Sequence, residues 1–117
     1  MNFSKSIELA FTNIGSFKGR TSRIEALYFL LFYFIYTITL NVISISFVFP
    51  ASMNFIINLI MIPVGVSLYV RRLHDINKSG WYYLLLFTGI GTILLFYWFF
   101  IKKGNNGANS YGENPLS

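Results

Sequence analysis

Two long stretches of this sequence contain no charged residue. The first runs from Ala26 to Val70 and the second from Ser79 to Ile101. One charge at the centre of a membrane-spanning helix costs about 2.5 to 3.5 kcal/mol, so uncharged segments of this length are typical of helices that face lipid. The chain has 117 residues, of which 55% are hydrophobic, and a soluble domain of this size cannot bury so much apolar surface. The pattern therefore predicts an integral membrane protein.

The first uncharged stretch is too long for a single span. At about 1.5 Å per residue it would form a helix of about 67 Å, more than twice the hydrocarbon core of ~30 Å. Pro50 disfavours helix at the residue before it, so Phe49-Pro50-Ala51-Ser52 is the expected turn between two spans. We predict transmembrane helices near 26–48 and 53–70. Polar side chains within them are interpreted as hydrogen-bonding partners between the two helices, with a substrate path as the alternative: Thr37, Asn41, Ser44, Asn54 and Asn58.

The second uncharged stretch predicts a third transmembrane helix over 81–101. It is rich in Leu, Ile and Phe, which insert favourably, and aromatic residues lie near both ends as in interfacial belts. Gly89 and Gly91 permit close helix contact or a local break. An odd number of spans would carry Lys102 and Lys103 to the outer side, although basic residues are typical of cytoplasmic loops. A re-entrant third segment is the alternative that removes this conflict.

The two ends of the chain differ from the spans. Residues 1–17 place apolar side chains on one helical face, which predicts an amphipathic helix in the membrane interface, with packing on the protein's own loops as the alternative. Ser22-Arg23-Ile24-Glu25 has the form of a capping box and predicts a helix start near Arg23. Residues 104–117 have the composition of a loosely ordered polar tail. The predicted fold is an all-α membrane protein, one integral membrane domain over 1–117 with an N-terminal interfacial helix, three transmembrane helices and a C-terminal tail.

Basic residues beside the spans set the orientation. Those that flank the first and second spans, away from the Pro50 turn, are Lys18, Arg20, Arg23, Arg71, Arg72 and Lys78. Because cytoplasmic loops carry the excess of Lys and Arg, we predict a multi-pass protein with a cytoplasmic N-terminus. The net charge of +5 arises from these flanks and not from a basic stripe on a polar domain, so nucleic acid is not an expected partner.

The densest polar cluster is Arg71-Arg72-Leu73-His74-Asp75, and the predicted topology brings it to the same membrane face as Arg20 and Arg23. Guanidinium groups match phosphate geometry, and each cation at headgroup depth contributes about 1 kcal/mol towards anionic lipid. We therefore predict a site that binds lipid headgroups or a partner protein, and a role in topology alone is the alternative. Its candidate residues are Arg20, Arg23, Arg71, Arg72, His74 and Asp75.

Other chemistry has little support in the sequence. The chain has no cysteine and one histidine, which excludes thiolate catalysis and leaves too few ligands for a typical metal site. We expect no catalytic residue, metal or cofactor. A lipid-headgroup enzyme with His74 as base and Asp75 as its orienting partner is the weakest hypothesis, because adjacent residues of a helix do not face one another. A small oligomeric transporter or channel is the alternative function, and the expected partners are the lipid bilayer, anionic phospholipid, a second copy of the chain or another membrane protein.

Three motifs carry a family resemblance. They are Phe17-x-Gly19-Arg20-x-Ser22-Arg23-x-Glu25, then Arg71-Arg72-Leu73-His74-Asp75 with Ser79-Gly80-Trp81, and Gly107-x-Asn109-x-Tyr111-Gly112 with Pro115. With them the chain resembles the domain-of-unknown-function family 805 of small bacterial inner-membrane proteins over nearly its whole length. It departs from the family pattern at Ala26-Leu27, where aromatic residues are common, at Tyr82 in place of tryptophan, and at Ser110 in place of arginine.

The resemblance implies a multi-spanning helical fold in the bacterial inner (cytoplasmic) membrane, and it brings no established activity, substrate or cofactor. It also implies that the tail docks in a definite place through Asn109 and Tyr111. The residues expected to have a structural role in the motifs are Gly19, Ser22, Glu25, Ser79, Gly80, Trp81, Asn109, Tyr111 and Gly112.

Overall fold

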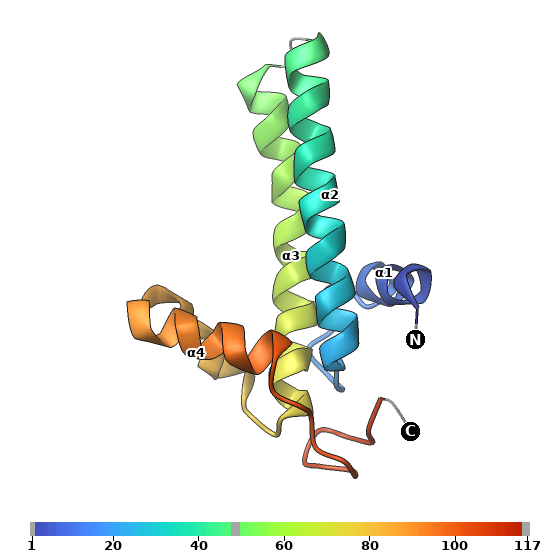
Figure 1. The fold of residues 1–117 in the computed structure, drawn as a ribbon, viewed down its shortest axis with the longest axis vertical. Coiled ribbons are helices and arrows are strands. Elements are labelled where there is room, and N and C mark those ends of the chain that lie inside the picture. The colour runs from blue at the N-terminus through green and yellow to red at the C-terminus, as the bar shows by residue number, and fades with distance from the viewer. Residues whose placement is uncertain (1, 48–49, 116–117) are drawn as a thin grey trace.

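A computed structural model describes residues 2–47 and 50–115 of the chain. Its elements are the helices α1 (Phe3–Thr12), α2 (Arg23–Phe47) and α3 (Ala51–Asp75), the 3₁₀ helix η1 (Gly80–Phe87) and the helix α4 (Gly89–Phe100). The helices α2 and α3 run side by side as a long hairpin, α1 and α4 lie across opposite sides of its lower part, and the C-terminal tail lies below them (Figure 1). The architecture is helical, as the uncharged stretches predicted.

Within residues 2–47 and 50–115, two helices are long and apolar enough to cross a membrane, and both belong to the hairpin. Each has 25 residues, which at about 1.5 Å per residue gives about 37 Å, enough for the hydrocarbon core with some tilt. These helices agree with the first two predicted spans, and Pro50 directly precedes α3 as expected. Val48 and Phe49, the end of the predicted first span and the start of its turn, lie outside the described residues.

Some polar side chains of the hairpin bond across it, whereas the buried Thr37 hydroxyl has no hydrogen-bond partner among the described residues. The Asn54 amide donates to the Ser44 hydroxyl at 3.0 Å, and the Tyr36 hydroxyl donates to the Ile57 carbonyl at 2.9 Å. Below these bonds the two helices meet in a buried core that includes Ala26, Val64 and Leu68. Because unpaired polar groups are costly in lipid, the cross-helix bonds fix which faces of α2 and α3 meet.

The N-terminal helix is shorter than the predicted 1–17 and packs against α2. It ends at Thr12, before Gly15, which adopts a φ of +77° that favours glycine. The Phe11 ring meets the Phe32 ring edge-on, with centroids 5.7 Å apart. The next helix then starts as predicted, since the Ser22 hydroxyl accepts from the Glu25 backbone N–H at 3.2 Å.

The helix α3 extends beyond its predicted end at residue 70 and includes the basic cluster. The predicted spans near 53–70 and over 81–101 leave 71–80 as the loop between them, and this is wrong for residues 71–75, which form the last turn of α3. Charged residues extend the helix here because their side chains find buried partners, described below. The helix stops just before Asn77, whose φ of 59° is left-handed.

The predicted third helix over 81–101 is not one continuous helix. The structure divides this segment into η1 and the 12-residue α4, with Thr88 extended between them at φ −115° and ψ 146°. The Thr88 hydroxyl caps α4 by accepting from the Gly91 N–H at 3.0 Å. A Cβ on Gly91 would lie 2.5 Å from the Leu85 carbonyl oxygen, so glycine permits η1 and α4 to fold back on each other. At about 1.5 Å per residue, α4 alone reaches about 18 Å, too short to cross a bilayer.

Candidate functional site

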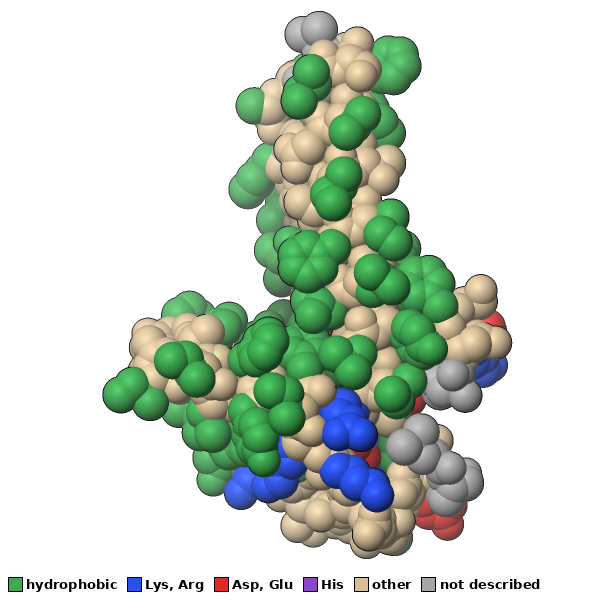
Figure 2. Space-filling model, in the orientation of Figure 1, with side chains coloured by type: hydrophobic (Ala, Val, Ile, Leu, Met, Phe, Trp, Pro, Cys, Tyr) green, Lys and Arg blue, Asp and Glu red, His purple; other side chains and the backbone are tan. Residues whose placement is uncertain are grey.

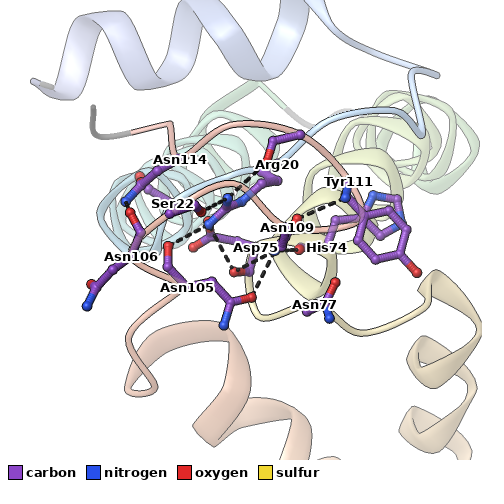
Figure 3. A network of polar contacts seen from close by, with 12 residues as sticks. Arg20, Ser22, His74, Asp75, Asn77, Asn105, Asn106, Asn109, Tyr111 and Asn114 are labelled. Atoms are coloured by element: carbon purple, nitrogen blue, oxygen red, sulfur yellow. Dashed lines mark hydrogen bonds and ion pairs between the residues drawn. The ribbon is translucent and has the colours of Figure 1, made fainter.

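Asp75, the last residue of α3, is the centre of a buried ionic network (Figure 3). Its Oδ1 atom lies 2.9 Å from Nη2 of Arg20, and its Oδ2 atom lies 2.8 Å from Nη1 of Arg72. The three side chains are at most 4% exposed. Two guanidinium groups and one carboxylate leave a net positive charge in a place that water does not reach, so the remaining donors must find neutral acceptors.

The polar tail supplies acceptors to Arg20. Its guanidinium donates to the carbonyl oxygens of Gly107 at 2.8 Å, Asn105 at 2.7 Å and Gly112 at 3.2 Å. The Asn105 N–H in turn donates to the Asp75 carbonyl at 2.9 Å. The tail is therefore held along its length against the end of α3. The prediction from composition that the tail is loosely ordered is wrong for the described residues 104–115. These residues are held because the buried Arg20 needs their carbonyls as acceptors.

Arg71 and Arg72 connect two other parts of the chain to the same point. Arg71 donates to the carbonyls of Asn13 at 2.9 Å and Ser16 at 2.8 Å, in the segment after α1. Arg72 donates to the Phe99 carbonyl at 2.9 Å and to the Lys102 carbonyl, at the end of α4. The end of α3 thus joins the segment after α1, the end of α4 and the tail.

The predicted site residues divide into two groups. Arg20, Arg71, Arg72 and Asp75 come together as predicted, but their polar atoms bond to other parts of the protein. Arg23 is half-buried and donates to the Ile101 carbonyl at 2.8 Å. Among the described residues, no group of three or more His, Asp and Glu side chains has the arrangement of a metal site.

His74 belongs to a separate arrangement beside the network. Its Nδ1 atom lies 3.0 Å from the Gly19 carbonyl oxygen, and its ring stacks on Tyr111 with centroids 3.9 Å apart and planes within 2°. The tail residue Asn109 donates to the His74 carbonyl at 2.9 Å, so the docking expected through Asn109 and Tyr111 is present. The Asp75 carboxylate pairs with arginines and not with His74, and the acid–base pair of the enzyme hypothesis does not form.

The hydrogen bond to Gly19 determines the tautomer of His74. A carbonyl oxygen only accepts, so Nδ1 carries the proton and a neutral ring has its lone pair on Nε2. His74 lies beyond Val70, where the uncharged part of α3 ends, and burial, as the largest cause, lowers the pKa of its imidazole below the ordinary value. The ring is therefore neutral at pH 7, with Nε2 as a hydrogen-bond acceptor.

An apolar cleft opens against this ring. Its volume is about 580 Å³, within the range of about 300 to 1,000 Å³ that is typical of small-molecule sites. All but one of its lining residues come from the three sequence motifs, and the exception is Val70: Phe17, Val70, His74, Ser79, Gly80, Trp81 and Tyr111. Sequence reasoning identified His74 and the motif residues separately and missed the cleft, for which Phe17 at the start of the first motif was the available signal.

Gly80 explains how the cleft is built. A Cβ on this residue would lie 2.7 Å from Cγ1 of Val70, closer than real carbon contacts allow, so only glycine lets the chain turn this tightly against α3. The Ser79 hydroxyl accepts from the Trp81 N–H at 3.3 Å and starts η1. Trp81 lines the cleft directly after this turn, and the residue is 79% exposed.

We expect the stability of the protein to fall as the pH is lowered through about 6.5, the ordinary pKa of histidine. Because burial lowers the pKa of His74, the unfolded chain binds a proton there more readily than the folded protein does, and the folded state loses stability as the pH decreases through that value. Thermal unfolding of detergent-solubilised protein between about pH 7.5 and about pH 5.5 measures this loss. A His74→Gln variant, whose amide can still donate to Gly19, should show a flatter pH profile. The same slope in both proteins would contradict the assignment.

Comparison with known proteins gives the chain clear relatives. A family model described as a protein of unknown function, DUF805, matches residues 14–113. The inner membrane protein YhaI of Escherichia coli strain K12 is 33% identical over 105 residues, which cover 88% of each chain, and YhaI of Escherichia coli O157:H7 gives the same values. No solved structure matches the chain. The matched region includes both the ionic network and the cleft.

Proposed function

The chain belongs to the DUF805 family of proteins of unknown function. We propose that it is a non-enzymatic inner-membrane protein that binds anionic lipid headgroups at its cytoplasmic end. In this proposal α2 and α3 cross the bilayer, while η1 and α4 enter only the cytoplasmic leaflet. Both chain ends then lie in the cytoplasm. The relative YhaI is an inner membrane protein, and the two helices of the hairpin have the length and composition to cross.

The contacts at both ends of the η1–α4 segment support this topology. At its start, Gly80 follows α3 by only a few residues and touches Val70. At its end, the carbonyls of Phe99 and Lys102 accept hydrogen bonds from Arg72. Since both ends meet the same turn of α3, the segment returns to the membrane face from which it leaves. Lys102 and Lys103 then stay on the basic side, which removes the conflict of a three-span topology.

The surface of the η1–α4 segment favours lipid as its surroundings. Large apolar side chains on it are mostly exposed, among them Phe87 at 84% and Ile90 at 86%. In Figure 2 hydrophobic side chains cover the hairpin and the α4 lobe, while many of the Lys and Arg side chains gather below them. An exposed apolar area of this extent is unfavourable in water. A segment that lies within one leaflet explains the absence of charge from Ser79 to Ile101 without a third crossing.

Labelling of single cysteines tests this topology, and the natural chain has no cysteine to interfere. We expect a membrane-impermeant maleimide to label a Ser52→Cys variant in intact spheroplasts, because that position follows the Pro50 turn. Ser16→Cys and Ser110→Cys should react only after the cells are opened. Labelling of Ser110→Cys from outside would restore the third crossing and contradict the proposal.

The observation that carries the lipid-binding proposal is a set of cations outside the ionic network. Their side chains are exposed or half-buried at the cytoplasmic end: Lys18, Arg23, Lys78, Lys102 and Lys103. Among the described residues, the exposed carboxylate in this region is Glu113, whereas Glu8 lies on α1 beside Lys5. The buried arginines give the end of the molecule its shape. Of the outer cations, Arg23 uses one donor for the Ile101 carbonyl and Lys78 lies over the Trp98 and Tyr82 rings, and both keep further donors for phosphate. Tyr36, Ser44 and Asn54 bond across the hairpin, which favours packing over the transporter alternative.

Neutralising two of these cations should weaken lipid binding. Each contributes about 1 kcal/mol, so we expect a Lys102→Gln, Lys103→Gln double variant to lose about 10- to 30-fold in affinity for phosphatidylglycerol. The measurement is the rise in melting temperature on titration of this lipid into purified protein, with phosphatidylcholine as the neutral reference. Lys5→Gln, on the exposed face of α1, is the matched control. Equal affinity in the double variant and the wild type would contradict the proposal.

A further inference from the structure

We propose that the cleft at His74 binds a neutral glycerolipid with a free hydroxyl group, such as diacylglycerol. The hydroxyl would donate to Nε2 of His74, and an acyl chain would lie along the apolar walls. This site is separate from the outer cations. It would recognise a hydroxyl group, whereas the outer cations recognise negative charge.

The polar end of the cleft is suited to a hydrogen-bond donor. The Nδ1 proton of His74 is used by the Gly19 carbonyl at 3.0 Å, so Nε2, which accepts, is the ring nitrogen left for a ligand. Within the described part of the chain, no hydrogen bond from a protein donor to Nε2 is found. Ser79 also lines the cleft, and the Trp81 N–H uses only an acceptor site of its hydroxyl, which leaves the hydroxyl proton to donate. A hydroxyl can both donate to Nε2 and accept from Ser79.

The charge of the lining indicates a neutral head. The described residues that line the cleft include no Lys, Arg, Asp or Glu. Three cations adjoin lining residues in the sequence, Lys18, Arg71 and Lys78, and none of them lines the cleft. Arg71 donates to the Asn13 and Ser16 carbonyls, and Nζ of Lys78 lies 5.6 Å from the Trp98 ring centre and 5.8 Å from that of Tyr82. A phosphate here would lose water without gaining a counter-charge, which is unfavourable. An uncharged hydroxyl loses less hydration free energy on entering the cleft, and its hydrogen bonds to the protein compensate for that loss.

The walls and the position of the cleft favour a lipid over a free polyol. Phe17, Val70 and Trp81 provide apolar surface, and burial of apolar area contributes about 25 cal/mol per Å². Trp81 is the second residue of η1 and is 79% exposed, as an aromatic residue at the headgroup level would be. The stacked pair of His74 and Tyr111 closes the cleft from the tail side. In the topology proposed above, on which this step rests, a lipid can reach the cleft from the bilayer with its hydroxyl towards the protein.

The single histidine of the chain makes the site directly observable. Nitrogen NMR of isotope-labelled, detergent-solubilised full-length protein reports Nε2 without ambiguity. We expect dioctanoylglycerol to shift this signal in a saturable way, while trioctanoylglycerol, which has the same chains and no hydroxyl, leaves it unchanged. Glycerol alone should act only at far higher concentration. No shift with dioctanoylglycerol, an equal shift with the capped analogue, or glycerol binding as tightly as the lipid would each overturn the proposal.

Two exposed aromatic residues of η1 provide matched variants. Trp81→Ala removes a wall of the cleft and should weaken dioctanoylglycerol binding about tenfold. Phe87→Ala removes a side chain of similar exposure, 84%, that does not line the cleft and should leave binding unchanged. Neither side chain is buried, so both proteins should fold. Equal affinities in the two variants would overturn the proposal, and phosphatidylglycerol binding through Lys102 and Lys103 would be unaffected by that result.

Discussion

Replacing Asp75 with asparagine should lower the free energy of unfolding by about 3 to 5 kcal/mol, because it leaves two buried guanidinium groups without a counter-charge. Arg20 and Arg72 are at most 1% exposed and bond to the two carboxylate oxygens at 2.9 and 2.8 Å. An asparagine side chain has nearly the same shape, but it accepts through one oxygen only, and its NH₂ group faces an arginine donor.

The loss should be visible in two measurements. Thermal unfolding in detergent gives the stability, and trypsin cleavage after Lys102 and Lys103 reports release of the tail, whose carbonyls bond to Arg20. Glu8→Gln is the matched control, since it also neutralises one acidic partner of an ion pair. That pair, with Lys5, is more than half exposed and 3.9 Å long, so its loss should change stability by less than about 1 kcal/mol. Similar effects of the two variants would mean that the Asp75 network does not stabilise the fold.

The second large effect is expected at Gly104, where the chain leaves α4 for the tail. A Cβ on this residue would overlap the Asp75 carboxylate. A free side chain would move away, but this carboxylate is held from both sides by Arg20 and Arg72. A Gly104→Ala variant must therefore displace either the ion pairs or the tail backbone, and we expect a loss of about 2 to 4 kcal/mol.

Gly107→Ala is the control for this prediction. Gly107 lies in the same tail segment, and a Cβ there would meet nothing within 4 Å. Both variants add one methyl group and reduce backbone freedom equally, so the difference between them isolates the contact with Asp75. The two melting temperatures and the two trypsin cleavage rates provide the comparison. Equal stabilities would show that the tail does not approach Asp75 as closely as the structure has it.

These two predictions concern the same feature, in which charged residues hold together segments that are far apart in the sequence. Buried ion pairs are often replaceable by apolar residues without loss of stability, so their value here is in defining one arrangement. In a helical membrane protein, apolar faces contact lipid as readily as they contact each other, and they select a unique packing weakly. Arg20, Arg71 and Arg72 select it by requiring particular carbonyls from the tail, from the segment after α1 and from the end of α4.

The position of the network also relates the two proposed ligand sites. The outer cations include Lys102 and Lys103, directly after the carbonyls that accept from Arg72. The cleft includes His74, the neighbour of Asp75, and Tyr111, within the tail that Arg20 holds. Both sites therefore depend on the same ionic centre for their geometry. Variants of Asp75 should weaken both kinds of lipid binding, whereas Trp81→Ala and the Lys102, Lys103 double variant should each affect one.

Several features of this protein follow from the sequence alone. The uncharged residues from Ala26 to Val70, interrupted by Pro50, give a hairpin of two long helices, since only backbone that bonds within its own helix is tolerated in lipid. The Ser22 and Glu25 pair determines where α2 starts, because capping is a local interaction. The convergence of Arg20, Arg71 and Arg72 was also predictable from topology.

Tertiary contacts determined the other features, which are the break at Thr88, the order of the tail and the partners of the arginines. Apolar composition predicts contact with lipid but not continuity of a helix, so the break at Thr88 depends on the packing of η1 against α4. Composition also gave no reason for an ordered tail, because its ordering comes from the carbonyls that a buried Arg20 requires. The arginines carry the same charge whether they face a phosphate or an internal carboxylate, and the positions of Asp75 and the tail determine which they meet. Helix caps and the preference for lipid depend on residues that are close together in the sequence. The partners that a buried charge requires come from segments that are far apart in the sequence.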